Sequence, residues 1–224
     1  FPNDIECNSS LTHINNSKHT LICTNPPFNS KNKIKFEQIE KNLKKDEYTK
    51  KNKINIDKLY ILKKDDPPIQ FLELDLFKLE KNGMCIIVLP YGEFFSGKSF
   101  KNTREHFMNE VNITDIILVP GGTFTHTGIK TCVLIFEKTK GGTKEITFSK
   151  IKNNECNDME KITSVSKKDI LDEEFYSWYH MDYLIDEMVN NLSMNMSNYE
   201  WINFGTMFSL EKGKLQSSDV EEDI

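Results

Sequence analysis

The residues best suited to chemistry lie in the segment Asn25-Pro26-Pro27-Phe28, which directly follows the apolar run Leu21 to Thr24. The two prolines fix the backbone and remove two N–H donors, and each disfavours helix at the residue before it. The side-chain amide of Asn25, the carbonyl of Pro26 and the ring of Phe28 are therefore expected together at the end of a strand. In an open α/β sheet, ligands bind at such strand ends.

These three groups suit a flat ring with an exocyclic amino group, such as an adenine that has left the DNA stack. Asn25 Oδ1 and the Pro26 carbonyl would accept the two N–H bonds, and Phe28 would stack on the ring. The alternative is an ordinary turn at the end of a strand, with Phe28 in the core. A four-residue motif alone does not decide between the two.

Composition bounds the class of protein. The 224 residues carry a net charge of -5, so the chain as a whole lacks the basic signature of a nucleic-acid-binding protein. Residues 31–64 are rich in Lys and Asn, a composition typical of a solvated surface. No apolar run is long enough to span a membrane, and no signal peptide is visible. The five cysteines form no C-x-x-C pair, so no zinc site is expected, and they fit a reduced, cytoplasmic setting: Cys7, Cys23, Cys85, Cys132 and Cys156.

Alternating strand and helix patterns indicate an α/β sheet with mainly parallel strands. A helix is expected over Ile69 to Leu79, begun by Pro67-Pro68 and ended by Asn82-Gly83. Residues 113–119 and 131–136 are expected to pair antiparallel, because the loop between them is short. The expected strands cover residues 21–24, 84–89, 113–119, 131–136 and 145–148, and further helices lie within residues 36–43, 100–111 and 170–189.

Taken in order, these motifs resemble those of the N6-adenine DNA methyltransferases of restriction–modification systems, above all the modification subunits of type I systems. The resemblance extends from about Thr20 to Lys138 and is weaker to about Leu184. It rests on the catalytic motif of the family and on three further segments: Asn25 to Phe28, Phe71 to Gly83, Ile86 to Phe95, and Val119 to Phe136.

The resemblance implies part of a Rossmann-like class I methyltransferase sheet, with strands resembling the fourth to seventh and helices on both faces. It implies transfer of a methyl group from S-adenosylmethionine to the N6 amino group of a flipped adenine in double-stranded DNA. By this resemblance Asn25, Pro26, Pro27 and Phe28 are catalytic, and Phe124 is the second aromatic wall of the base pocket. The alternative for Phe124 is an ordinary core residue that anchors its loop.

The chain departs from the family pattern on the cofactor side. No Asp/Glu-x-x-x-Gly-x-Gly segment precedes Asn25. The segment Cys7 to Leu11 resembles the Gly-Asp-Ser-Leu of the family, which places Asn8 beside the adenine of the cofactor, with Asn25 as a second cofactor contact. We therefore expect this chain to be inactive by itself.

The domain organisation also follows from the resemblance. Residues 1–150 are expected to form the C-terminal part of a catalytic domain, residues 151–198 a connecting helical segment, and residues 199–224 the start of a target-recognition domain. The segment Trp201 to Lys214 resembles the opening of a specificity subunit, or else is an amphipathic tail. Expected partners are therefore specificity and restriction subunits, or a fused recognition domain, and no membrane. Two other functions stay open: methylation of RNA or of a protein glutamine, and a non-catalytic DNA-binding or scaffold role.

Overall fold

A computed structural model describes residues 10–12, 14–28, 34–124, 128–153 and 158–185. The chain divides into two compact units, Phe1–Leu184 and Ile185–Ile224. The first unit contains every helix and strand discussed below. The segment resembling a target-recognition domain, at residues 199–224, lies outside the described residues.

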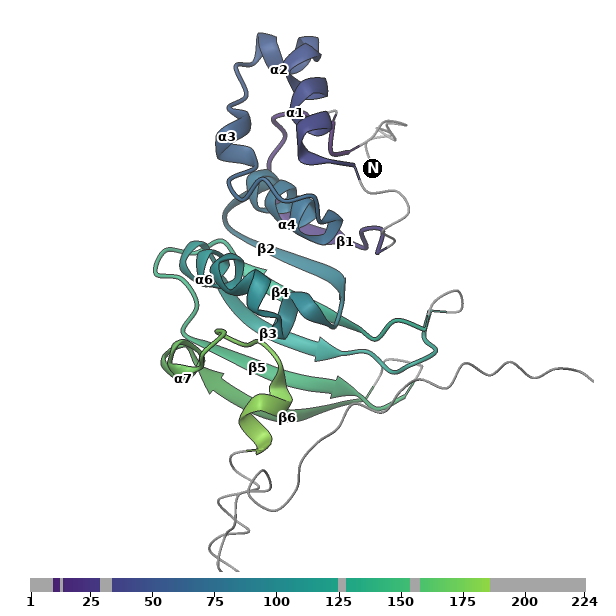
Figure 1. The fold of residues 1–224 in the computed structure, drawn as a ribbon, viewed down its shortest axis with the longest axis vertical. Helices are drawn as coiled ribbons and strands as arrows, with labels where there is room; N and C mark the ends of the chain where they lie inside the picture. The colour runs from purple at the N-terminus through teal and green to yellow at the C-terminus, as the bar shows by residue number, and fades with distance from the viewer. Residues whose placement is uncertain (1–9, 13, 29–33, 125–127, 154–157, 186–224) are drawn as a thin grey trace, which may run out of the picture. The chain divides into compact units, whose positions relative to one another are not determined.

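A six-stranded mixed sheet forms the first unit, with the strand order β1-β2-β4-β3-β5-β6 (Figure 1). β1 is parallel to β2, and β3 is parallel to β5, whereas β4 runs antiparallel to both β2 and β3. The α/β class and the antiparallel pairing of β3 with β4 are thus confirmed. The strands are β1 (His19–Thr24), β2 (Leu79–Pro90), β3 (Asn112–Leu118), β4 (Thr131–Glu137), β5 (Glu145–Ile151) and β6 (Met159–Ser166).

Helices flank the sheet and make its crossover connections. α4 (Pro67–Lys78) joins β1 to β2, and α6 (Lys101–Glu110) lies between β2 and β3. Three short helices precede α4 in the same connection. They are α1 (Phe36–Lys45), α2 (Glu47–Lys51) and α3 (Ile56–Leu59). The remaining described helices with a label are α5 (Glu93–Ser96), the 3₁₀ helix η2 (Lys98–Phe100) and α7 (Lys167–Asp172).

One hydrophobic cluster joins the helices to one side of the sheet. Cys85, Ile87 and Leu89 alternate along β2 toward this cluster, whereas the residues between them are only half-buried. This alternation is the period of two that a strand imposes on its side chains. Ile69 and Leu72 of α4 pack on the same cluster, so the crossover helix is fixed against the strands that it connects.

The expected helix end at Asn82-Gly83 is wrong. α4 ends at Lys78, and Leu79 is already extended, with φ -75° and ψ 133°. Asn82 instead adopts a left-handed conformation within β2, with φ 62°, where the β1–β2 register shifts. A Cβ added at Gly83 would lie 3.0 Å from the carbonyl oxygen of Thr20. Gly83 therefore allows β2 to approach β1 closely, because it has no Cβ.

The sheet continues beyond the boundary expected at residue 150. β5 runs to Ile151, and the strand β6, which the sequence did not predict, pairs antiparallel with it. Five of its eight residues are Lys, Glu, Thr or Ser and it lacks an apolar run, because β6 is an edge strand in which only Val165 is buried. The expected helix within residues 170–189 corresponds to helical residues 180–185. The division into catalytic and connecting segments stays a prediction.

Candidate functional site

The segment Asn25–Phe28 leaves the carboxyl end of β1 in irregular backbone. Pro26 is buried and anchors the turn, whereas Asn25 and Pro27 are exposed and Phe28 is half-buried. The side-chain amide of Asn25 makes no hydrogen bond with any described residue. The side-chain amide of Asn25 is therefore exposed and free of described partners at this edge of the sheet.

The rings of Phe28 and Phe124 meet at this turn. Their centroids are 6.2 Å apart and their planes are inclined by 89°, an edge-to-face pair. Phe124 belongs to the loop between β3 and β4, so two loops that are distant in sequence converge beside Asn25. Such pairs are favourable beyond their buried area. The two aromatic residues expected in one pocket are thus brought together, and their role as walls for a base stays a prediction.

Asp75 of α4 supports the strand that leads into this turn. Thr24 Oγ1 donates a 2.7 Å hydrogen bond to Asp75 Oδ2, and the thiol of Cys85 lies 3.9 Å from the same oxygen. The carboxyl is only 3 % exposed. Burial raises the pKa of Asp75 to about 6, against the opposing effect of the hydrogen bond from Thr24. Asp75 therefore fixes the residue immediately before Asn25.

Two more polar side chains of α4 are buried, and the sequence analysis missed all three. Gln70 Nε2 donates to the carbonyls of Ile34 and Lys64, each at 3.0 Å. Glu73 Oε1 accepts from the Leu62 amide at 2.8 Å, and burial raises the pKa of Glu73 to about 7. Apolar residues occur on every side of this helix, which indicates packing on more than one side. Nothing in the sequence, however, singles out these three polar side chains as buried.

A second group of aromatic residues lies at the carboxyl end of β2. The hydroxyl of Tyr91 is 2.8 Å from His180 Nδ1 and accepts from the His180 amide at 3.2 Å. The ring of Tyr91 also lies against Tyr179, with centroids 5.3 Å apart. Burial lowers the pKa of His180. A pocket of about 250 Å³ adjoins this group, lined also by residues of the β3–β4 loop. Its members come from separate regions, which is why sequence reasoning did not find it.

The cofactor side of the site is incomplete among the described residues. Asn8, the expected contact to the adenine of S-adenosylmethionine, lies outside them. No glycine-rich turn follows β1, which is an edge strand of the described sheet. The described residues alone therefore do not fit this cofactor. Within the same residues, no group of three or more His, Cys, Asp or Glu could hold a metal ion, and no helix is long and apolar enough to cross a membrane.

Comparison with protein families gives one match that covers most of the chain. The family described as N-6 DNA Methylase matches residues 3–214. The match includes the turn at Asn25, the loop that carries Phe124, and the whole described sheet.

One solved structure shares the fold at a TM-score above 0.5, and two others are similar to part of the chain. The type IIG restriction endonuclease BpuSI is 14% identical over 82% of this chain, with a TM-score of 0.54. The M protein of the type I restriction enzyme EcoKI is 20% identical over 60% of the chain, with a TM-score of 0.45. A type I methyltransferase subunit from Streptococcus thermophilus is 22% identical over 64%, with a TM-score of 0.43. The chain covers 24%, 26% and 28% of these three chains, so it spans about a quarter of their length.

Proposed function

Because the chain belongs to the N-6 DNA Methylase family, we propose that it supplies the target-base side of a site-specific, adenine-specific DNA methyltransferase of a restriction–modification system. The substrate is an adenine flipped out of double-stranded DNA, and the methyl group comes from S-adenosylmethionine. The protein that contains this chain works in the cytoplasm with specificity and restriction subunits, or with a fused recognition domain.

The adenine amino group is a poor nucleophile, because its lone pair is delocalised into the ring. Asn25 Oδ1 and the Pro26 carbonyl accept its two N–H bonds, which localises the lone pair and aims the nitrogen. Phe28 stacks on the extruded ring, and Phe124 closes the pocket. S-adenosylmethionine, when bound, supplies the electrophilic methyl group. Catalysis on this side is orientation and electrostatic stabilisation, without a covalent intermediate on the protein.

The observation that carries the proposal is the contact between Phe28 and Phe124 beside the exposed amide of Asn25. Two loops that are far apart in sequence place two aromatic rings and one amide acceptor at the carboxyl edge of the sheet. A turn that merely ended a strand would need neither the second loop nor an exposed amide. Stacking a base on aromatic side chains returns roughly 1–3 kcal/mol, comparable with the few kcal/mol that base flipping costs.

Asn25→Ala in the full-length protein tests the assignment. We expect methyl transfer to fall by about 10²-fold or more, the order found when one oriented hydrogen-bonding group is lost, while DNA binding changes little. Transfer of a tritiated methyl group measures the rate, and fluorescence anisotropy measures binding. Asn102→Ala, on the exposed surface of α6, is the matched control. Activity of the Asn25 variant within threefold of the unmodified protein would exclude this role.

A further inference from the structure

Residues 35–64, which include α1, α2 and α3, form a small module built around a second hydrophobic cluster. Phe36, Ile39 and Leu43 of α1 are buried against Leu59 and Tyr60. This cluster is distinct from the one beneath the sheet, and residues outside the module complete it: Leu11 and Ile14, which precede β1, and Leu74 on α4. α4 therefore packs on the sheet with one side and on this lysine-rich module with the other.

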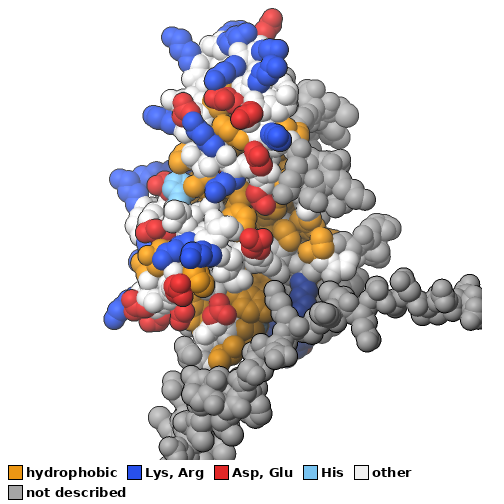
Figure 2. All heavy atoms as spheres, in the orientation of Figure 1, with side chains coloured by type: hydrophobic (Ala, Val, Ile, Leu, Met, Phe, Trp, Pro, Cys, Tyr) orange, Lys and Arg blue, Asp and Glu red, His pale blue; other side chains and the backbone are white. Residues whose placement is uncertain are grey.

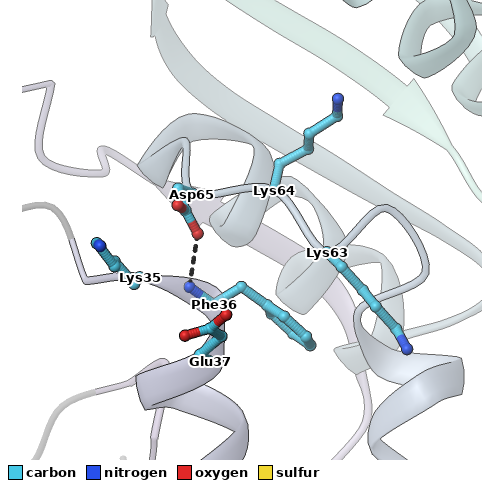
Figure 3. Close-up of a pocket in the computed structure, with 6 residues that line it drawn as sticks. All are labelled: Lys35, Phe36, Glu37, Lys63, Lys64 and Asp65. Carbon is cyan, nitrogen blue, oxygen red and sulfur yellow. Dashed lines mark hydrogen bonds between the residues drawn. The ribbon is translucent and has the colours of Figure 1, made fainter.

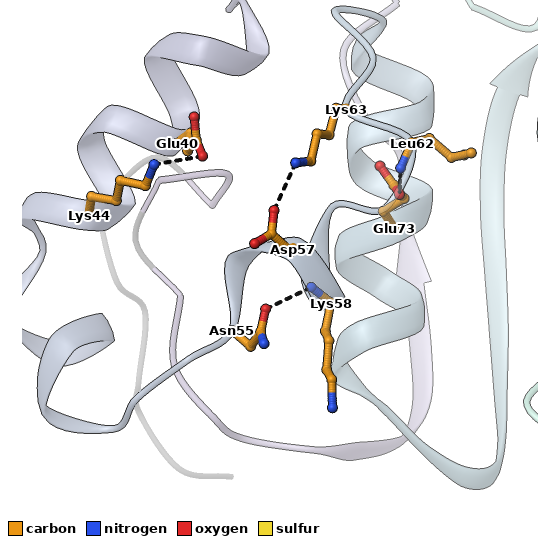
Figure 4. A network of polar contacts seen from close by, with 8 residues as sticks. All are labelled: Glu40, Lys44, Asn55, Asp57, Lys58, Leu62, Lys63 and Glu73. Carbon is orange, nitrogen blue, oxygen red and sulfur yellow. Dashed lines mark hydrogen bonds and ion pairs between the residues drawn. The ribbon is translucent and has the colours of Figure 1, made fainter.

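The lysine-rich module carries a charge opposite to that of the whole chain. It holds ten lysines and five acidic residues, a net charge of +5, whereas the chain as a whole carries -5. All ten lysines are exposed. Two of them form ion pairs, Lys44 with Glu40 and Lys63 with Asp57, both at 2.8 Å (Figure 4). The other eight pair with no described acidic residue, and Figure 2 shows blue side chains gathered over α1 to α3 at the upper end of the view.

The two ends of the lysine-rich module are tied together at its base. Asp65 Oδ1 accepts a 2.8 Å hydrogen bond from the Phe36 amide (Figure 3), and Gln70 bridges the carbonyls of Ile34 and Lys64. A cavity of about 460 Å³ at this base is lined by Lys35, Lys63 and Lys64 together with Phe36, Glu37 and Asp65. In Figure 3 the three lysine side chains point in different directions, away from one another. That arrangement suits an extended polyanion better than a single enclosed anion.

α4 fixes the lysine-rich module relative to the Asn25 turn. Asp75 lies beside Thr24, the last residue of β1, and α4 runs back along the sheet, so its first eight residues extend past the strand end. At 1.5 Å per residue this extension is about 12 Å. The contacts to the module are made from the same stretch, by Gln70 and Glu73. The module is therefore held by the same stretch of α4 that extends past the end of β1, the strand that leads into the Asn25 turn.

We propose that the lysine-rich module binds the phosphate backbone of duplex DNA next to the target adenine. This inference rests on the proposed function and assigns one part of the molecule to one part of that substrate. Exposed lysines without acidic partners act as point charges on phosphates and release counterions when they bind. Such contacts position a duplex without reading its sequence. They would hold the target base over Asn25 while a recognition element elsewhere selects the site.

Replacing four lysines of α1 and α2 together tests the proposal: Lys41→Gln, Lys45→Gln, Lys50→Gln and Lys51→Gln, in the full-length protein. The control replaces four exposed lysines outside the module, Lys140, Lys144, Lys161 and Lys168, by Gln. Both variants lose the same charge. Affinity for a labelled duplex is measured by anisotropy across about 50 to 200 mM salt, and methyl transfer is measured at saturating DNA.

We expect the module variant to bind DNA about 10-fold or more weakly, with the slope of log affinity against log salt reduced by about 2 to 4, near 0.9 for each phosphate that is no longer neutralised. Methyl transfer at saturating DNA should stay within about threefold, because Asn25 is untouched. Equal changes in the two variants, or no change in slope, would overturn the proposal, as would a loss of affinity for RNA but not for duplex DNA. A normal effect of Asn25→Ala beside an unaffected module variant would leave the proposed function standing and reject this inference alone.

Discussion

The sheet and the lysine-rich module are stabilised by different interactions. The sheet joins strands of six to twelve residues through hydrogen-bonded ladders, and one cluster of buried side chains runs beneath it. The module has helices of ten, five and four residues, lengths that are marginal for an isolated helix in water. Its order depends on packing against α4. The comparison teaches that one helix, α4, supports both the sheet edge that carries Asn25 and an attached charged surface.

Truncating one buried leucine in each region gives the largest expected difference between the sheet and the lysine-rich module. Leu134 in β4 is 1% exposed and Leu43 in α1 is 0% exposed, so both deletions leave a cavity. We expect Leu134→Ala to lower the free energy of unfolding of the whole sheet by about 3–4 kcal/mol. Leu43→Ala should instead open the module locally, because the module is built around a hydrophobic cluster distinct from that of the sheet. Hydrogen exchange measured by mass spectrometry distinguishes the two.

Faster exchange in the peptides of α1 to α3, with unchanged exchange in β2 and β4, is the result expected for Leu43→Ala. Equal loss of protection in both regions would show one cooperative unit, and the distinction drawn between the sheet and the lysine-rich module would then fail. Leu134→Ala, which should affect every region, serves as the reference for global unfolding.

The buried carboxyls of α4, which lies between the sheet and the lysine-rich module, predict that the stability of the fold depends on pH. Burial raises the pKa of Asp75 to about 6 and that of Glu73 to about 7, above the values of exposed carboxyls. The folded state therefore binds protons more tightly than the unfolded state, and stability falls as the pH rises from about 4 to 7. With about 1.4 kcal/mol per pKa unit, the loss due to Asp75 is on the order of 3 kcal/mol.

Asp75→Asn should remove that share of the pH dependence, because the amide does not ionise and its Oδ1 still accepts from Thr24. Urea denaturation followed by the fluorescence of the buried Trp178, at several pH values between about 4 and 7.5, measures the slope. Glu73→Gln is the companion variant. If both variants keep the slope of the unmodified protein, the groups responsible lie elsewhere in the chain.

The sequence predicted the sheet far better than it predicted the module. Strands such as Met84–Leu89 consist of continuous apolar runs, and proline and glycine separate them from helices. The existence of β1 to β4 and the antiparallel pairing of β3 with β4 could therefore be anticipated, whereas the pairing of β2 with β4 was not. The module could not be, because its lysines fit a solvated loop equally well and its core depends on Leu74 of a neighbouring helix. β6 was missed for the related reason that an exposed edge strand has no apolar run.

The residues of the candidate site also fall into those that the sequence could predict and those that it could not. Asn25 and Phe28 are close together in sequence and could be named from it, and Phe124 followed from the resemblance to a family. Asp75, Gln70 and Glu73 could not be named, because their role depends on where the helix packs. A polar residue on a helix is usually exposed, and only the packing on both sides of α4 shows that these three are buried and bonded.

Phe28→Ala is expected to produce a smaller effect, of about 10-fold on DNA binding, in keeping with a stacking contribution of roughly 1–3 kcal/mol. The loss should be smaller on duplexes that carry an abasic or mismatched target than on an intact duplex, because Phe28 contributes only after the base has left the stack. Fluorescence anisotropy on the three duplexes measures this. Equal losses on all three would indicate that Phe28 serves the packing against Phe124 alone.

The last prediction is the absence of a binding signal, and it concerns the cofactor S-adenosylmethionine. We predict that a polypeptide of residues 1–224 does not bind S-adenosylmethionine with useful affinity, even though its sheet and its lysine-rich module are both present. In this class of fold the cofactor lies across the strand ends and is cradled by a glycine-rich turn, which does not precede Asn25 in this sequence. β1 is an edge strand of the described sheet, and Leu21 on it is 57% exposed. An exposed edge of this kind favours pairing with another copy, so the polypeptide should also self-associate. Isothermal titration with the cofactor and analytical ultracentrifugation measure the two properties. A dissociation constant near 10 µM for a monodisperse monomer, which corresponds to roughly -7 kcal/mol, would contradict both expectations and would mean that the sheet alone holds the cofactor.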